Sequence, residues 1–285
     1  MKTQSMVSRA KINLSLSVLG KREDGYHDIE SVMQTVEFGD VVTVTHTKEP
    51  GIRIQSSHPE LPIDEGNIAY RAAKLMQENY EIPGGFTIFL DKRIPVAAGL
   101  AGGSTNAAAV MHLINHLCDL SLTKEQLADL GVTLGADVPF CLYGGAALCR
   151  GIGEQITPIQ GLRNCHILLV NPGVGVSTAM IYQAIDSAPA VDKADTEKLL
   201  SGLLEQNLSM AFSEMKNMME PVARGICPEI SGLLEKLQEA GADHVMMSGS
   251  GATCVGFFVN KPDEEKLKDL FGKDFVALTV PGAIG

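Results

Sequence analysis

The stretch Pro95-Val96-Ala97-Ala98-Gly99-Leu100-Ala101-Gly102-Gly103-Ser104 lies between two segments of different periodicity. Before it, Phe86-Thr87-Ile88-Phe89-Leu90 alternates as a strand does, and after it residues 104–117 carry apolar side chains at the spacing of one helix face. Glycines let a chain turn sharply and approach an anion closely, while the first turn of a helix offers unpaired N–H groups. The order strand, glycine-rich loop, helix therefore predicts a phosphate-binding loop.

This loop matches neither of the common nucleotide-binding patterns. The chain has no G-x-x-x-x-G-K-[ST] and no G-x-G-x-x-G. A glycine-containing loop before an alanine-rich helix can also serve close helix packing alone. The cluster Ser104-Thr105-Asn106 favours phosphate, because hydroxyls at a helix N-terminus can bind phosphate or Mg²⁺; the same residues are candidates for the helix N-cap.

The rest of the chain mixes strand and helix patterns, which indicates the α+β class. A length of 285 residues suits two domains at roughly 100–200 residues each. The turn-rich Thr157-Pro158-Ile159-Gln160-Gly161 indicates the boundary, so we expect domains at 1–160 and 161–285. The periodicities predict strands at 10–19, 40–46, 52–55, 86–90, 166–170, 245–247, 253–259 and 275–280, and helices at 67–80, 104–117, 196–206, 208–219, 228–240 and 262–271.

Composition excludes several classes of protein. A net charge of −11 argues against a nucleic-acid binder, which needs a basic surface. The six cysteines include no C-x-x-C pair, so we expect small buried side chains rather than zinc ligands or disulfides. The residues after Lys2 and Arg9 lack the continuous apolar core of a signal peptide, and the longest mostly apolar run, 138–149, is too short to span a bilayer. We expect a cytoplasmic protein without a membrane or nucleic-acid partner.

Three segments, read together, resemble the GHMP kinase superfamily of small-molecule kinases. They are Ala10-Lys11-Ile12-Asn13-Leu14, the glycine-rich loop, and the glycine turn Ser248-Gly249-Ser250-Gly251-Ala252. The resemblance runs across nearly the whole chain. It implies a ribosomal-S5-like N-terminal domain, a ferredoxin-like α/β-plait C-terminal domain and an active site in the cleft between them. It also implies ATP as phosphoryl donor, with Mg²⁺ required by the chemistry and its ligands unassigned.

Two further stretches narrow the resemblance to one branch of the superfamily. Gly20-Lys21-Arg22-Glu23-Asp24-Gly25-Tyr26-His27 and Leu134-Gly135-Ala136-Asp137-Val138-Pro139-Phe140 are similar to the kinases that phosphorylate the 2-hydroxyl of a cytidine diphosphate-linked methylerythritol, in the non-mevalonate route to isoprenoid precursors. A kinase of the homoserine or mevalonate type and a catalytically inactive ligand sensor are the alternatives. The partner is then a small molecule, bound by a monomer or a homodimer.

Phosphoryl transfer to an alcohol needs an acceptor for the hydroxyl proton, and the resemblance implies Asp137 as that general base. Its alternative role is the cap of a helix that begins near Val138. Lys11 is the implied partner that stabilises developing negative charge; its alternative is a solvated lysine at a strand edge. Because Ile12 and Leu14 alternate with them, Lys11 and Asn13 lie on one face of the strand, and Asn13 is a candidate partner for the substrate's polyol.

The same resemblance implies that Tyr26 and His27 hold the cytosine, by stacking and by hydrogen bonds to the edge of the base. Tyr182 occupies the place of the second stacking aromatic, with Thr178 as a further substrate residue; Tyr182 alone would read as a core residue.

The expected ATP site comprises the loop and two flanking residues, Asn67 and Lys92. The alternative role of Asn67 is a helix N-cap, and that of Lys92 is a surface charge. Its residues are Pro95, Ala97, Gly99, Leu100, Ala101, Gly102, Gly103, Ser104, Thr105, Asn67 and Lys92, and the supporting turn contributes Ser248, Gly249 and Gly251. The superfamily loop usually reads Gly-Leu-Gly-Ser-Ser. Here Ala101 stands at the second glycine, where a left-handed backbone is costly for a residue with a Cβ.

Overall fold

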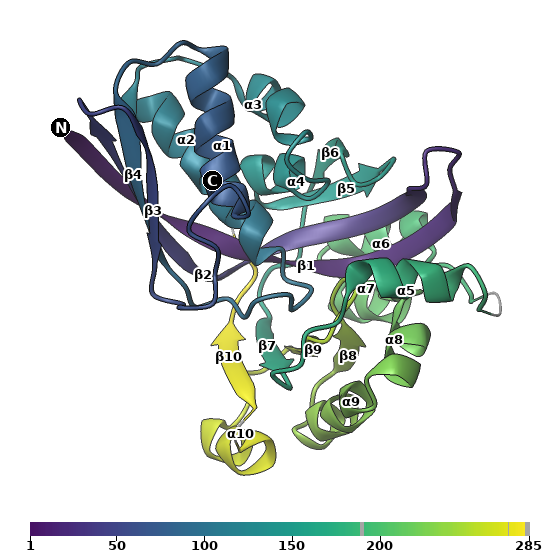
Figure 1. Ribbon diagram of the computed structural model, residues 1–285. Helices are drawn as coiled ribbons and strands as arrows, with labels where there is room; N and C mark the ends of the chain where they lie inside the picture. Colours follow the sequence, from purple (N-terminus) through teal and green to yellow (C-terminus); the bar gives the residue numbers. More distant parts are fainter. Residues whose placement is uncertain (189–190, 273, 283–285) are drawn as a thin grey trace. The chain divides into compact units, whose positions relative to one another are not determined.

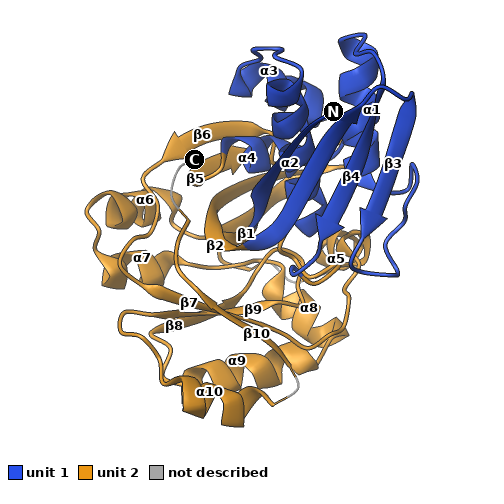
Figure 2. Ribbon diagram, turned by 90° about the vertical axis from the view of Figure 1, so that its left-hand side faces the viewer, with its two compact units in different colours: residues 1–10, 39–94, 101–143 blue, residues 11–38, 95–100, 144–285 orange. Residues whose placement is uncertain are grey.

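The computed structural model describes residues 1–188, 191–272 and 274–282. Its elements form an α+β fold with two compact units that interleave along the chain, as Figure 2 shows by colour. Unit 1 comprises Met1–Ala10, Gly39–Ile94 and Ala101–Tyr143, and unit 2 comprises Lys11–Phe38, Pro95–Leu100 and Gly144–Gly285. The long strands β1 (Lys2–Lys21) and β2 (His27–Thr47) each contribute residues to both units. The domain boundary near residue 160 stays a prediction.

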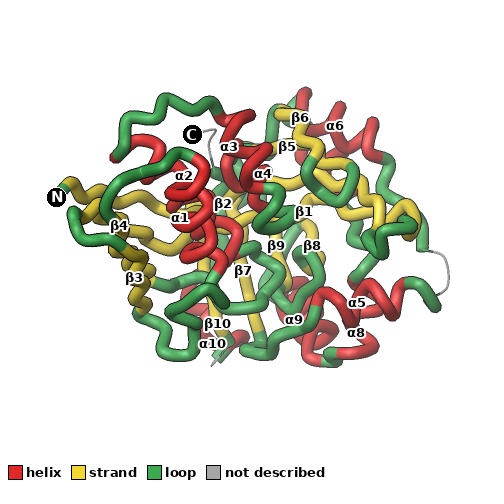
Figure 3. The backbone as a smooth tube through the Cα atoms, turned by 45° about the horizontal axis from the view of Figure 1, so that its top comes forward, coloured by secondary structure: helices red, strands yellow, loops and turns green. Residues whose placement is uncertain are grey.

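Unit 1 packs helices on a mixed sheet. Its strand order is β3-β4-β2, with β3 parallel to β4 and β4 antiparallel to β2. Helices α1 and α2 lie side by side (Figure 3) and share a core with the inner face of the sheet, built from side chains such as Val42, Phe86, Met76 and Met111. Besides the early part of β1 and the late part of β2, its elements are β3 (Gly51–Ser56), β4 (Gly85–Asp91), α1 (Ile68–Asn79), α2 (Gly102–Leu117), α3 (Lys124–Gly131) and α4 (Val138–Tyr143).

Unit 2 contains two sheet segments. In the first, β2 pairs with β5 (Ala146–Arg150) and β5 pairs with β6 (Gln155–Ile159). The second is antiparallel, in the order β10-β7-β9-β8, and α9 packs against β8 and β9 (Figure 1). Its remaining elements are β7 (His166–Asn171), β8 (His244–Met247), β9 (Cys254–Phe258), β10 (Phe275–Thr279), α5 (Thr178–Ile185), α6 (Thr196–Leu204), α7 (Leu208–Glu214), α8 (Glu220–Ile226), α9 (Glu229–Glu239) and α10 (Glu264–Phe271).

The predicted strand at 10–19 is the second half of a longer strand. β1 begins at Lys2, because polar side chains at its start pair across to β2. The hydroxyls of Thr3 and Thr45 lie 2.9 Å apart and those of Ser5 and Thr43 lie 2.7 Å apart. Cross-strand pairs of this kind stabilise a sheet without any apolar pattern, which is why the sequence did not indicate the extension.

The N-cap predicted for the helix after the glycines is wrong. Helix α2 begins at Gly102, and its N-cap is Ala101, which makes no side-chain capping bond. Ser104, Thr105 and Asn106 therefore lie inside the first two turns of the helix. The helix starts before the polar cluster because Gly102 and Gly103 are its first two residues and not the end of the loop.

His244 predicts a measurable pH dependence of stability. Its ring contacts those of Phe212 and Phe257, burial lowers its pKa to about 4, and its Nε2 finds no hydrogen-bond partner among the residues described. The unfolded state binds the proton below a pKa of about 6.5, whereas the folded state does not until about pH 4. The contribution to stability is therefore present above pH 6.5 and is lost as the pH falls, by about 2 kcal/mol between pH 7 and pH 5.

Urea unfolding at both pH values checks this expectation in the parent and in His244→Phe. The free energy of unfolding should fall less in the variant, because phenylalanine takes no proton. An equal fall in both proteins would assign the pH dependence to other groups.

Candidate active site

Lys11 and Asn13 lie together on β1, within unit 2. Lys11 is 4% exposed and Asn13 is 1% exposed, so the solvated lysine considered as an alternative is wrong. The Nζ of Lys11 donates to Oδ1 of Asn13 at 2.8 Å, and Nδ2 of Asn13 donates to Oγ of Ser31 at 2.8 Å. The prediction that the two side chains share one face of the strand is confirmed. A buried ammonium beside an amide oxygen is suited to stabilise negative charge on a bound group.

The glycine turn packs directly on these two residues. The backbone N–H of Asn13 donates to Oγ of Ser248 at 3.4 Å, and that hydroxyl donates to the carbonyl of Gly99 at 3.0 Å. Gly249 has a positive φ of 57°, and a Cβ added to it would lie 3.3 Å from Nζ of Lys11. The turn thus lies against both the lysine and the first half of the glycine-rich loop.

The segment Pro95–Leu100 is held in unit 2 by backbone contacts. The carbonyl of Leu100 accepts from the N–H of Lys11 at 3.2 Å, and the carbonyl of Ala98 accepts from Thr253 at 3.3 Å. A Cβ on Gly99 would lie 2.3 Å from the carbonyl oxygen of Ser248, and its φ is 76°. Only glycine fits there, since both the space and the dihedral exclude a side chain.

Two alanines in the loop adopt the left-handed conformation. Ala97 has a φ of 52° and Ala101 a φ of 55°, which costs about 1–2 kcal/mol per residue relative to the right-handed region. Gly102 and Gly103 follow at the start of α2, where first-turn N–H groups are available to an anion. The hydroxyl of Thr105 donates to the carbonyl of Gly102 at 3.0 Å. The alanine at position 101 therefore does not prevent the turn, but it strains it.

Lys92 is buried in unit 1 rather than on the surface. Its side chain is 5% exposed and forms an ion pair with Asp40, which is fully buried. Asp40 also accepts from the backbone N–H groups of Arg93 and Ile94 at 2.7 and 2.8 Å, and from Nδ2 of Asn106 at 2.8 Å. This cluster ties the end of β4 to α2. The surface-charge alternative for Lys92 is wrong, while its contact with a nucleotide stays a prediction.

Asn67 is the N-cap of α1, so the alternative considered for it is confirmed. Its Oδ1 accepts from the N–H of Ala69 at 3.0 Å, and its Nδ2 donates to the carbonyl of Pro62 at 2.8 Å. These bonds fix the loop before α1. A contact of Asn67 with the adenine base of ATP stays a prediction.

Asp137 lies immediately before α4 in unit 1. Its carbonyl accepts from the N–H of Cys141 at 3.1 Å, which places it at the entrance of the helix. The residue is half-buried. This position agrees with the alternative reading of a residue that opens a helix, and a role as general base is compatible with it.

The two residues predicted to bind cytosine, one just before β2 and one at its start, differ in exposure. Tyr26 is 58% exposed, whereas His27 is 8% exposed and stacks on Tyr182, with ring centroids 4.7 Å apart and planes at 18°. Tyr182 is half-buried on α5 and is not a core residue. Nearby in unit 2, the hydroxyl of Thr178 lies 2.8 Å from that of Ser250 in the glycine turn.

An ion-pair cluster that the sequence did not reveal surrounds His27. Its Nε2 lies 2.6 Å from Oδ1 of Asp186, and Nζ of Lys21 lies 2.6 Å from Oδ2 of the same carboxylate. The hydrogen bonds from Lys21 and His27 lower the pKa of Asp186, so its ionised carboxylate accepts a proton-bearing Nε2. Tyr182 on α5 and Asp186, the C-cap of the same helix, are four residues apart, and this spacing was the available signal.

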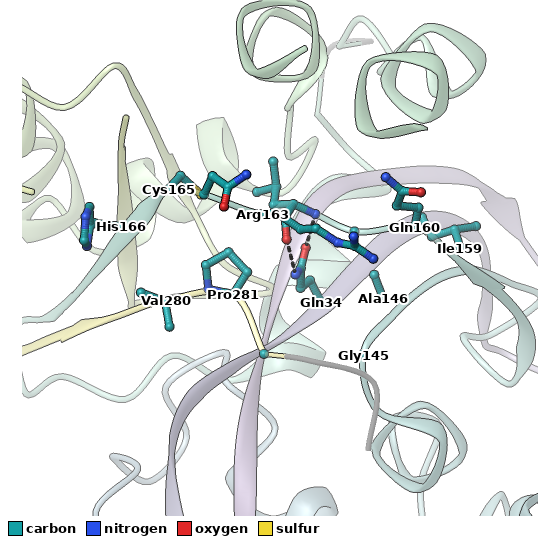
Figure 4. A pocket seen from close by; sticks show the side chains of 14 residues that line it. Gln34, Gly145, Ala146, Ile159, Gln160, Arg163, Cys165, His166, Val280 and Pro281 are labelled. Carbon is teal, nitrogen blue, oxygen red and sulfur yellow. Dashed lines mark hydrogen bonds between the residues drawn. The ribbon is translucent and has the colours of Figure 1, made fainter. Parts of the chain in front are cut away.

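None of the predicted site residues lines the pocket that Figure 4 shows, in unit 2. This pocket has a volume of about 660 Å³ and is bounded by the β6–β7 connection, Gln34 and the chain near Pro281. There, Nε2 of Gln34 donates to the carbonyl of Leu162 at 3.1 Å, and Oε1 of Gln34 accepts from the N–H of Leu162 at 2.8 Å. Among the described residues, no group of three or more His, Cys, Asp or Glu side chains is arranged to hold a metal ion.

Comparison with known proteins relates the chain to one family of kinases. The models of the GHMP kinases N terminal domain and GHMP kinases C terminal match residues 67–145 and 197–276. A 4-diphosphocytidyl-2-C-methyl-D-erythritol kinase from Alkaliphilus metalliredigens is 47% identical over 91% of this chain and 89% of its own length. One from Clostridioides difficile is 44% identical over 90% of this chain and 87% of its own. The chain belongs to this kinase family.

The solved structures agree with membership of the 4-diphosphocytidyl-2-C-methyl-D-erythritol kinase family. A crystal structure of 4-(cytidine 5'-diphospho)-2C-methyl-D-erythritol kinase is 32% identical, covers 98% of this chain and 100% of its own, and superposes with a TM-score of 0.81. A homoserine kinase from Cytophaga hutchinsonii, 21% identical, covers 99% and 96% with a TM-score of 0.77 and shows the shared fold alone. The expected α+β GHMP kinase fold is confirmed. Within the described residues, no helix is both long and apolar enough to cross a membrane.

Proposed function

We propose that this chain transfers the γ-phosphate of ATP to the 2-hydroxyl of 4-diphosphocytidyl-2-C-methyl-D-erythritol, giving the 2-phosphate and ADP. The kinases of this name that match nine-tenths of the chain at 44–47% identity support the substrate. The observation that carries the chemistry is the buried Lys11–Asn13 pair against the glycine turn and the segment of Gly99. This reaction belongs to the non-mevalonate route to isoprenoid precursors.

In the proposed reaction, Asp137 accepts the proton of the 2-hydroxyl as its oxygen bonds to the γ-phosphorus. The bond from that phosphorus to the β–γ bridging oxygen breaks, and ADP leaves with the electron pair. Lys11 stabilises the negative charge that develops on the attacking oxygen, and Asn13 holds Lys11 in place.

The loop residues and the start of α2 would hold the triphosphate through backbone N–H groups. Gly102 and Gly103 fit this role, since they begin the helix and carry no side chain over its first-turn N–H groups. Mg²⁺, when bound with ATP, supplies neutralisation of phosphate charge, and it commonly takes only one or two protein ligands. We propose Ser104 as a candidate contact of Mg²⁺. We also propose that the enzyme works in the cytoplasm, as a monomer or a homodimer.

A coupled assay of ADP release tests the proposed substrate. The purified chain is supplied with ATP, Mg²⁺ and, in turn, the cytidyl substrate, homoserine and mevalonate. We expect turnover of the cytidyl substrate alone. Turnover only of homoserine or mevalonate would refute the substrate, and ATP binding without any turnover would favour a ligand sensor.

Replacing Tyr26 by alanine should weaken binding of the cytidyl substrate and leave ATP binding unchanged. The exposed ring is available to stack on a base, and loss of one base–aromatic stack costs about 1–3 kcal/mol, or roughly a 5- to 150-fold rise in the dissociation constant. Titration calorimetry with each ligand separately measures both affinities.

Tyr26→Phe is the matched control, since it keeps the ring and removes only the hydroxyl. It should bind the cytidyl substrate within a fewfold of the parent. If Tyr26→Ala weakened both ligands equally, Tyr26 would have no cytosine-specific role.

A further inference from the structure

Asn217 binds the glycine turn and the residue before it through its side-chain amide. It lies between α7 and α8 and is 6% exposed. Its Nδ2 donates to the carbonyls of Met247 and Gly249 at 2.9 and 2.8 Å, while its Oδ1 accepts from the N–H of Met219 at 2.9 Å. Both amide hydrogens and the amide oxygen are therefore used to fix backbone.

The backbone around Asn217 is itself attached to β1. The N–H of Leu16 donates to the carbonyl of Lys216 at 2.9 Å, and the N–H of Met218 donates to the carbonyl of Leu16 at 2.9 Å. The same strand carries Lys11 and Asn13. Glu220 adds a second hold on the turn, since its Oε2 accepts from the N–H of Met247 at 2.9 Å.

The glycine turn contacts the groups of the proposed reaction. Gly249, bound by Asn217, lies against Nζ of Lys11, and the adjacent Ser248 donates to the carbonyl of Gly99. All these residues belong to unit 2. We propose that Asn217 is a positioning residue for phosphoryl transfer, which sets the placement of the Lys11 ammonium and of the Gly99 segment through the glycine turn. This proposal rests on the proposed function.

Asn217→Ala leaves two buried carbonyls without donors, so the turn must move toward other partners. A displacement of about 1 Å can cost up to roughly a hundredfold in rate. We expect kcat per folded molecule to fall roughly ten- to hundredfold and the dissociation constant for ATP to rise several-fold. Binding of the cytidyl substrate, measured without ATP, should weaken less than ATP binding, because Tyr26 and His27 are hydrogen-bonded to Asp24 and Asp186, and of the predicted substrate residues only Asn13 and Thr178 reach this turn.

Asn217→Asp keeps the size of the side chain but presents an acceptor to two carbonyls. Burial raises the pKa of such a carboxyl, and its protonated form regains one O–H donor. The ratio of the variant's kcat to that of the parent should therefore rise as the pH falls from about 8 to 6. A side chain that served only as filler would give a ratio independent of pH.

Asn207→Ala is the matched control for stability. Asn207 caps α7 through the N–H of Met210 at 3.1 Å, so its loss lowers stability by about 1 kcal/mol without touching the turn. Its kcat and ATP affinity should equal those of the parent. If Asn217→Ala does not fold, Glu220→Ala releases the same turn at Met247 and carries the same test.

Normal kcat and ATP affinity in folded Asn217→Ala, or in Glu220→Ala and Asn217→Asp, would overturn the positioning role. If the parent does not turn over the cytidyl substrate, the proposed function fails. The ATP affinity of Asn217→Ala still tests whether Asn217 positions the Gly99 segment, because ATP binding is measured without turnover.

Discussion

Asp137→Asn is expected to lower kcat by roughly a hundredfold or more, the usual scale for loss of a general base. Asparagine keeps the size of the side chain and can still cap a short helix, so the entrance of α4 should be retained. The thermal midpoint should therefore change little while turnover is lost. Steady-state kinetics at saturating ATP and cytidyl substrate, together with a melting curve, measure both quantities.

The matched control is Asp195→Asn, at the N-cap of α6, where Oδ1 accepts from the N–H of Lys198 at 3.1 Å. It makes the same chemical change at a helix start outside the expected site, and kcat should be unaffected. A kcat within a fewfold of the parent in Asp137→Asn would reduce Asp137 to a residue that opens a helix.

Lys11→Met should lower kcat by about a hundredfold, again with little change in stability. The Nζ of Lys11 is the cation that the proposed reaction assigns to the attacking oxygen, and stabilisation of this kind is commonly worth a factor of 10²–10³. Methionine has a similar length and removes the cost of burying a charge, while Oδ1 of Asn13 loses its donor; these opposing effects should keep the change in stability small. Kinetics and urea unfolding together distinguish the two effects.

Lys74→Met serves as control, since its Nζ pairs with Glu65 at 2.7 Å on the surface of unit 1. Such a pair contributes little, so both kcat and stability should stay near the parent values. Parent-like kcat in Lys11→Met would leave Lys11 with a structural role only.

Sequence patterns predicted the elements that carry a local signal. The alternation around Lys11 and Asn13 predicted both on one face, and the hydrogen bond between their side chains confirms it. Helices α1 and α2 followed from their apolar spacing, with the start of α2 misjudged by two residues. Helix α3 was not predicted, because its eight residues are too few for a clear periodicity, and α4 was indicated only as the helix that Asp137 would cap.

Asp186 and Asn217, which the sequence missed, and the burial of Lys92 all depend on partners distant in the sequence. Asp186 meets His27 across 159 positions, and Lys92 is buried because Asp40, 52 positions earlier, neutralises it. Asn217 falls within the helix predicted at 208–219, but α7 ends at Glu214, and Asn217 binds a turn 32 positions later. Such contacts follow from tertiary packing, which no local pattern records.

The interleaving of the two units bears on how the chain folds as it is made. All residues of unit 1 have been synthesised once residue 143 is made. The segment Lys11–Phe38 belongs to unit 2, and its part of β2 can pair with β5 only after β5 has been made, followed by β6. Synthesis runs from the N-terminus, and units usually fold when their residues are present. The strand segment that carries Lys11 is therefore made among the first residues and incorporated among the last, and a fragment beginning at residue 161 contains neither unit whole.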